Sequence, residues 1–242
     1  MILGVIPARF ASTRFPGKPL ADIGGKTMIQ RVYEQAVLSK QLQKVVVATD
    51  DQRIYAHVRM FGGEVMLTRA DHPSGTDRCA EVAEQYPDAR FILNIQGDEP
   101  FIQPEQIDLL ALTLIEQTQT GIATLAKKIE QVEALDNPNI VKVVVSQTGE
   151  ALYFSRYAIP FLRGAAPENR LGQHTFYKHI GLYGFQRETL QRITALSPTP
   201  LERAESLEQL RWLEHGFRIA VRFTEMETIG VDTPEDLKKL VF

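Results

Sequence analysis

A chain of 242 residues with 44% hydrophobic and 24% charged side chains has the composition of a folded globular protein, which excludes disorder, a collagen-like repeat or a coiled coil as its overall design. The net charge of −3 provides no general positive field for nucleic acid or an anionic membrane surface. Cys79 is the single cysteine, which excludes an internal disulfide and a zinc site of several thiolates and is typical of a reducing, cytoplasmic compartment.

The first half of the chain alternates short apolar runs with amphipathic segments. Residues 2–6, 45–48, 64–67 and 91–95 are predicted strands, and residues 27–38, 51–60 and 76–85 are predicted helices. The run at 2–6 is too short for a signal peptide, and no later run is long enough for a membrane span of about 20 residues. This order predicts an α/β fold with a mostly parallel, Rossmann-like sheet in three layers, with ligands beyond the carboxyl ends of its strands.

The second half departs from this alternation. A helix beginning near Pro104 is followed by predicted strands at 122–126, 140–145 and 151–154, which indicates a smaller antiparallel addition around 140–190 within a single domain of residues 1–242. Residues 163–173 are expected to form a surface loop. Two helices are expected to close the chain, at 201–214 with Gly216 as its end signal, and at 234–241 with Pro234 at its first position.

The strand at 2–6 leads into a loop that carries three cations, Arg9, Arg14 and Lys18, and the hydroxyl of Ser12. Backbone N–H groups in such a turn form an anion nest, and arginine and lysine add charge-assisted donors, so the loop suits a triphosphate. The alternative is a solvated basic loop. The spacing G-x-x-x-x-G-K-[ST] is missing, which argues against a P-loop ATPase.

Two aspartates follow glycines at distant places in the chain. Asp98 lies in Q-G-D-E-P after the strand at 91–95, and Asp232 lies in G-V-D-T-P before a helix. Two such carboxylates can share Mg²⁺ and leave its other positions to phosphate oxygens and water. For Asp232 the alternative is a helix cap, and Glu99 is a further candidate ligand.

Three further segments carry polar groups. S-G-T-D-R at residues 74–78 can bind a base at a helix start, or only cap that helix. H-I-G-L-Y-G-F at residues 179–185 alternates along a strand and places His179 and Tyr183 on one face. Glu205, Glu208 and Gln209 have the spacing of one helix face, which can bind a polyhydroxylated acid or only face solvent.

The run I-P-A-R-x-x-S-T-R-x-P-G-K-P-L at residues 6–20 resembles the N-terminal signature of CMP-Kdo synthetases, the 3-deoxy-manno-octulosonate (Kdo) cytidylyltransferases. Q-G-D-E-P, G-V-D-T-P, S-G-T-D-R, H-x-G-x-Y-x-F and L-E-Q-L-R are similar to further motifs of that family. The resemblance implies the nucleotide-diphospho-sugar transferase fold, CTP and Kdo as substrates, Mg²⁺ as cofactor, a homodimer and a place in bacterial lipopolysaccharide biosynthesis.

The same resemblance assigns roles to individual residues. It implies catalytic roles for Arg9, Arg14, Lys18, Asp98 and Asp232, with Asp98 and Asp232 as the metal ligands. It implies CTP binding by Arg9, Ser12, Lys18, Ser74, Gly75, Thr76, Arg78 and Gln96. It implies sugar binding by Arg14, Gln96, Arg156, His179, Tyr183, Glu208 and Gln209.

These assignments predict in-line attack of the anomeric hydroxyl on the α-phosphorus of CTP, with pyrophosphate as the leaving group. No histidine is placed well enough to be named as a general base. Rival interpretations are a cytidylyltransferase for sialic acid or an amino-substituted octulosonate, a catalytically silent nucleotide-sugar sensor, and, less favoured, a glucose-1-phosphate nucleotidyltransferase.

Overall fold

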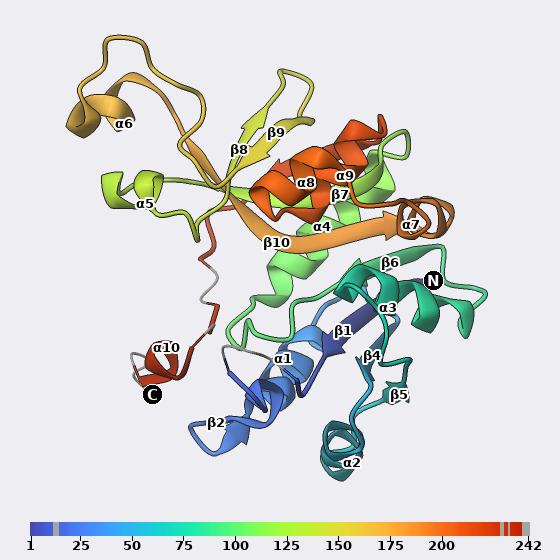
Figure 1. Ribbon diagram of the computed structural model, residues 1–242. Coiled ribbons are helices and arrows are strands. Elements are labelled where there is room, and N and C mark those ends of the chain that lie inside the picture. Colours follow the sequence, from blue (N-terminus) through green and yellow to red (C-terminus); the bar gives the residue numbers. More distant parts are fainter. Residues whose placement is uncertain (12–14, 228–229, 232, 239–242) are drawn as a thin grey trace.

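A large mixed sheet forms the centre of the molecule (Figure 1). The structure is a computed structural model that describes residues 1–11, 15–227, 230–231 and 233–238. From edge to edge the main path of the sheet contains β11 (Arg218–Phe223), β7 (Gly121–Lys128), β10 (Tyr177–Gln186), β6 (Phe91–Asn94), β1 (Ile2–Ala8), β4 (Lys44–Thr49) and β5 (Val65–Leu67).

The expected α/β fold with a mostly parallel sheet is confirmed. β1 pairs in parallel with β4 and β6, β4 with β5, and β7 with β11, whereas β10 runs antiparallel between β6 and β7. A hairpin of β8 (Lys142–Val145) and β9 (Ala151–Ser155) joins the sheet through β10. Because β10 runs in the opposite sense, its first residues lie at the same edge of the sheet as the last residues of β6 and β7.

Helices cover both faces of the sheet, as near-continuous apolar strands require. Apolar residues of α1 (Met28–Ala36), α2 (Gln52–Met60) and α4 (Pro104–Glu116) pack in the core on one face. On the other face the core contains residues of α3 (Gly75–Glu84), α7 (Arg187–Thr194) and α9 (Glu208–Glu214). Cys79 and Trp212 are buried in this second core, where both pack against apolar neighbours.

Two sequence-based predictions about the second half are wrong. The helix expected at 201–214 is two helices, α8 (Pro200–Glu205) and α9, because Ser206 adopts a left-handed conformation with φ of 51° and turns the chain between them. The loop expected at 163–173 contains a 3-10 turn, η2 (Pro167–Asn169), and a short helix, α6 (Arg170–Gln173). Gly216, with φ of 77°, does follow the end of α9 as expected.

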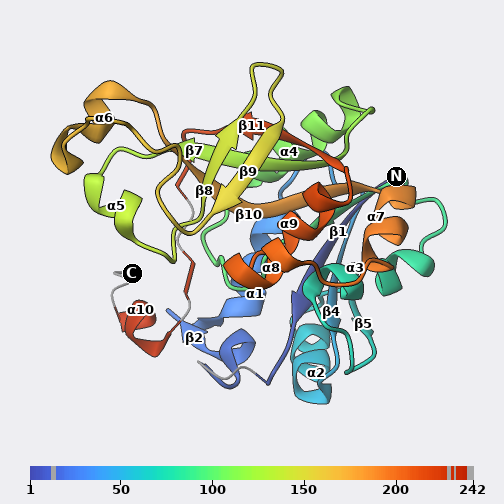
Figure 2. The same ribbon diagram turned by 45° about the horizontal axis from the view of Figure 1, so that its top comes forward.

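Smaller elements surround this centre (Figures 1 and 2). They are the 3-10 turn η1 (Lys18–Leu20), the ribbon of β2 (Asp22–Ile23) and β3 (Lys26–Thr27), α5 (Val132–Asp136) and α10 (Pro234–Lys238). In both views α10 lies near β2 (Figures 1 and 2). Within the described residues, no helix is both long and apolar enough to cross a bilayer.

Candidate active site

The loop after β1 and the loop after β6 meet at the carboxyl edge of the sheet. β1 and β6 are parallel neighbours, so the residues that follow Ala8 and Asn94 emerge side by side. The Nζ atom of Lys18 donates a hydrogen bond of 2.7 Å to Oδ2 of Asp98. The structure therefore brings together one predicted phosphate-binding cation and one predicted metal ligand, which lie 80 positions apart in the sequence.

Gly97 permits the close contact between these two loops. A Cβ atom at this position would lie 2.7 Å from the backbone oxygen of Pro7, a distance at which backbone atoms have to move. Glycine thus lets the loop that carries Asp98 lie directly against the end of β1.

The C-terminal segment reaches the same place. The backbone N–H of Val231 donates to the backbone oxygen of Asp98 at 3.0 Å. Val231 is fully buried and packs with Ile23 and Met28, which fixes this part of the chain beside the carboxyl edge. Asp232 follows Val231 in the sequence but lies outside the described residues, as do Ser12 and Arg14.

Asp98 has the chemistry of a ligand for a hard cation. Its side chain is 34% exposed, and its carboxylate faces Lys18. Neighbouring Glu99 is buried, its Oε2 atom has no hydrogen-bond partner among the described residues, and burial, with a smaller effect of Asp98, raises its pKa to about 8. The described residues contain no group of three or more His, Cys, Asp or Glu side chains arranged for a metal. Mg²⁺ commonly takes one or two carboxylates and completes its shell with phosphate and water, so these oxygen donors fit that ion.

Asp50, at the carboxyl end of β4, links two of the predicted CTP-binding arginines. Its Oδ2 atom lies 3.2 Å from Nη2 of Arg78 and 3.8 Å from Nε of Arg9. Arg78 is fully buried and also donates to the hydroxyl of Thr68. The structure therefore places Arg78 behind Asp50, whereas Arg9 is the exposed member of the set. Asp50, like Asp98, is an acidic residue shortly after a buried strand, and that position was its signal in the sequence.

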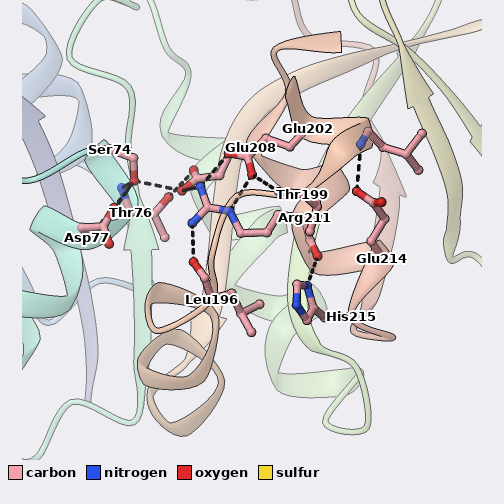
Figure 3. Close-up of polar contacts among 11 residues, drawn as sticks. Ser74, Thr76, Asp77, Leu196, Thr199, Glu202, Glu208, Arg211, Glu214 and His215 are labelled. Carbon is pink, nitrogen blue, oxygen red and sulfur yellow. Dashed lines mark hydrogen bonds and ion pairs between the residues drawn. The ribbon is translucent and has the colours of Figure 1, made fainter. Parts of the chain in front are cut away.

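The start of α3 contacts α9 (Figure 3). Ser74 caps α3, because its Oγ atom accepts from the backbone N–H of Thr76 at 3.1 Å and of Asp77 at 3.3 Å. The Oγ atoms of Thr76 and Ser74 lie 2.7 Å and 2.9 Å from the two carboxylate oxygens of Glu208. Burial raises the pKa of Glu208, and these two hydroxyl contacts oppose that shift. Predicted nucleotide and sugar residues thus form one network.

The sequence spacing predicted that Glu205 and Gln209 share one helix face, but the structure places them on different helices. Gln209 is buried on α9, but Glu205 lies on α8, where it accepts from Ser155 Oγ at 2.6 Å and from the backbone N–H of Arg156 at 2.9 Å. The guanidinium of Arg156 donates to three backbone oxygens, of Glu205, Ser206 and Pro138. Arg156 and Glu205 line a cleft of about 820 Å³ beside α5.

His179 and Tyr183 lie together on β10. Their ring centroids are 5.2 Å apart, although the pairing of β10 with β7 shifts between them. The hydroxyl of Thr124, a residue that sequence reasoning missed, lies 2.9 Å from Nε2 of His179 and within 3.1 Å of two carbonyl oxygens of the bulge. Burial lowers the pKa of His179 to about 3, so the ring is neutral.

Gln96 connects this strand to the loop of Asp98. Its Nε2 atom donates to the backbone oxygen of Gly181 at 2.9 Å. The hydroxyl of Tyr183 is buried without a hydrogen-bond partner among the described residues, and the Tyr183 ring packs edge-on against Trp212. A buried hydroxyl of this kind has unused capacity for a ligand.

Comparison with known proteins agrees with this arrangement. The family model described as cytidylyltransferase matches residues 3–223. A 3-deoxy-manno-octulosonate cytidylyltransferase of Cytophaga hutchinsonii is 55% identical, covering 99% of this chain and 96% of that protein, and one of Bacteroides thetaiotaomicron is 55% identical, covering 98% and 95%. The chain belongs to this family of cytidylyltransferases.

Solved structures agree at the level of the fold. A CMP:2-keto-3-deoxy-manno-octonic acid synthetase in complex with CTP superposes with a TM-score of 0.91 at 43% identity, covering 98% of this chain and 95% of that one. A glucose-1-phosphate thymidylyltransferase from Bacillus anthracis, described as putative, shares the fold alone, with a TM-score of 0.65 at 15% identity and coverage of 99% and 93%.

Proposed function

We infer that this enzyme transfers CMP from CTP to Kdo, releases pyrophosphate and forms CMP-Kdo for bacterial lipopolysaccharide. The observation that supports this function best is the contact between Lys18 and Asp98. It joins the basic loop and the Q-G-D-E-P segment at the carboxyl edge of the sheet. The identity of 55% over nearly the full length of relatives with that activity in their names supports Kdo as the acceptor.

The reaction forms a bond between the anomeric oxygen and the α-phosphorus and breaks the bond from that phosphorus to the oxygen of the β-phosphate. The hydroxyl proton is released, and pyrophosphate leaves. Such chemistry depends on positioning and on compensation of negative charge. Arg9 and Lys18 supply cations at the end of β1, and Arg14 is proposed to act with them. Ser12 is proposed to donate its hydroxyl to the same phosphates.

We propose Mg²⁺ as the cofactor, held by Asp98 together with Asp232. When bound, the ion would compensate charge on the phosphates of CTP. The bond from Val231 to Asp98 supports this pairing, because it fixes the chain next to Asp232 beside Asp98.

The base and ribose of CTP are proposed to lie against Ser74, Gly75 and Gln96, with Thr76 and Arg78 supporting that surface from behind, since both are buried. The sugar is proposed to contact Gln96, His179, Tyr183, Glu208 and Gln209, and its carboxylate to pair with Arg14 or Arg156. A neutral His179 suits hydroxyl groups better than a carboxylate.

A homodimer and a cytoplasmic location complete the proposal. Both come from the family. The exposed side chains of Leu152, Tyr157 and Phe161, near β9 and in the loop after it, offer apolar area for a second copy of the chain. A single cysteine is compatible with the reducing cytoplasm.

The decisive experiment measures pyrophosphate release from CTP and Kdo with Mg²⁺ and with EDTA. Release that requires all three components supports the function. Equal rates with sialic acid or an amino-substituted octulosonate would move the acceptor assignment to those sugars. Tight CTP binding without release for any acidic sugar would instead support a nucleotide-sugar sensor.

A further inference from the structure

Arg211, on α9, is the centre of a buried charge network that links α8, α9 and α3 (Figure 3). Its Nε and Nη2 atoms donate to the two carboxylate oxygens of Glu202 at 2.8 and 2.6 Å, and Nη1 donates to the backbone oxygen of Leu196 at 3.1 Å. Its side chain is only 8% exposed, so a substrate has little access to it.

The same guanidinium lies beside Glu208. Nη2 of Arg211 is 3.8 Å from Oε1 of Glu208, the oxygen that also lies 2.9 Å from Ser74 Oγ. The other oxygen of Glu208 accepts from Thr76 at 2.7 Å. One carboxylate is therefore held from two sides, by the first turn of α3 and by Arg211.

The charges around Arg211 are unequal. Glu202 is hydrogen-bonded to the guanidinium, Glu208 lies 3.8 Å from it, and Asp77 adds a smaller electrostatic effect, so the acidic side chains outnumber the one cation in a partly buried place. Removing the cation would leave Glu202 and Glu208 without compensation, and a buried carboxylate in that position takes up a proton or turns toward water. Either change would alter the direction in which Glu208 offers its oxygens.

We propose that Arg211 is a positioning residue for the sugar site, which fixes the carboxylate of Glu208 between α9 and α3 without touching substrate. This rests on the proposed function, in which Glu208 accepts hydrogen bonds from sugar hydroxyls. Because Glu208 also binds Ser74 and Thr76, the same network sets the distance between α9, which carries proposed sugar-binding residues, and the start of α3, which carries proposed CTP-binding residues.

The test compares KM values for Kdo and CTP in Arg211→Gln, Arg211→Lys and the control Arg203→Gln, whose side chain is exposed on neighbouring α8. We expect Arg211→Gln to raise KM for Kdo by at least about tenfold and KM for CTP by less than about threefold. Arg211→Lys keeps the charge but loses the bidentate contact with Glu202. Its KM for Kdo should therefore lie between those of the parent enzyme and Arg211→Gln. The control should match the parent enzyme.

A double-mutant cycle separates positioning from general damage. If Arg211 acts through Glu208, adding Arg211→Gln to Glu208→Gln should raise KM for Kdo no further. An unchanged KM for Kdo in Arg211→Gln, or an additive rise in the double variant, would overturn the proposal. If Arg211→Gln does not fold, the same cycle with Arg211→Lys distinguishes the two outcomes. A parent enzyme that releases no pyrophosphate from CTP and Kdo would refute the proposed function itself, which keeps the two failures distinct.

Discussion

Asp98 is the most informative single residue of the site because it has two neighbours, Lys18 at its carboxylate and Val231 at its backbone oxygen. Asp98→Asn keeps the size of the side chain but removes the charge that a divalent cation requires. We expect kcat to fall by at least about a hundredfold, a loss of the size seen when one electrostatic group of an active site is removed. Pyrophosphate release at saturating Mg²⁺ checks this.

The matched control for Asp98→Asn is Glu105→Gln, which removes an exposed carboxylate at the start of nearby α4. It should keep the parent rate. Near-normal turnover of Asp98→Asn at high Mg²⁺ would contradict a metal role for Asp98.

His179 should make stability depend on pH. Its folded-state pKa of about 3 lies below the ordinary value of 6.5, so the unfolded chain binds the proton more readily. The contribution of neutral His179 to the free energy of unfolding is then fully present above about pH 6.5. It falls as the pH drops toward 3, by at most about 1.4 kcal/mol per pH unit. Urea unfolding at pH 7 and pH 5 should show a larger loss for the parent protein than for His179→Gln.

His174 provides the control for that measurement, because its side chain is exposed. His174→Gln should lose stability on acidification as the parent does. Identical pH dependence of His179→Gln and the parent would show that His179 is not the responsible group.

At the scale of elements, the contact between the ends of β6 and β1 depends on Gly97. Gly97→Ala places a Cβ atom 2.7 Å from the backbone oxygen of Pro7 and has to push the two loops apart. We expect a lower melting temperature and, because Asp98 moves with its loop, a lower kcat as well. Gly172→Ala, on α6, is the matched change, since a Cβ atom there meets nothing within 4 Å. Parent-like melting and turnover for both variants would disprove the argument.

Most core elements were predictable from local pattern. The apolar runs at 2–6, 45–48 and 91–95 contain strands, because burial on both faces leaves a continuous signal, and the run at 64–67 contains the less buried β5. β11 was not predicted, since Arg218 and Arg222 make a short edge strand resemble a surface segment. The break at Ser206 was missed for a different reason, because a left-handed residue leaves the apolar spacing of 201–214 unchanged.

The candidate site was predictable to the same extent. Strand ends in a parallel sheet share one edge, which predicts that the loops carrying Lys18 and Asp98 lie near one another. The contact of Ser74 and Thr76 with Glu208 spans more than 130 positions and depends on how α9 packs against α3, which no local pattern encodes. The burial of Arg78 could not be predicted from local sequence either, because its partners Asp50 and Thr68 come from other parts of the chain.

At the scale of the whole molecule, the described part of the C-terminal segment reaches the carboxyl edge of the sheet beside the loop of Asp98. Val231 anchors it, fully buried against Ile23 and Met28. Val231→Ala removes part of that anchor at a cost of roughly 1–3 kcal/mol of local packing. We expect the Mg²⁺ concentration for half-maximal activity to rise several-fold, because the proposed ligand Asp232 is the next residue.

Val37→Ala is the comparison for that variant, since Val37 is a valine with 47% of its surface exposed. Its Mg²⁺ dependence should equal that of the parent. An unchanged Mg²⁺ requirement in Val231→Ala would contradict the prediction that burial of Val231 positions the proposed metal ligand.

The complete burial of Cys79 has a practical consequence for watching this protein work. Burial raises the pKa of its thiol well above the ordinary value, so maleimide dyes should not react with Cys79 in the native enzyme. A cysteine introduced at Met60, which is 82% exposed and outside the apolar area proposed for a second copy, would then carry a fluorophore alone, without first deleting the natural thiol. Subunit association and substrate-linked movement could be followed by fluorescence on an otherwise unaltered chain.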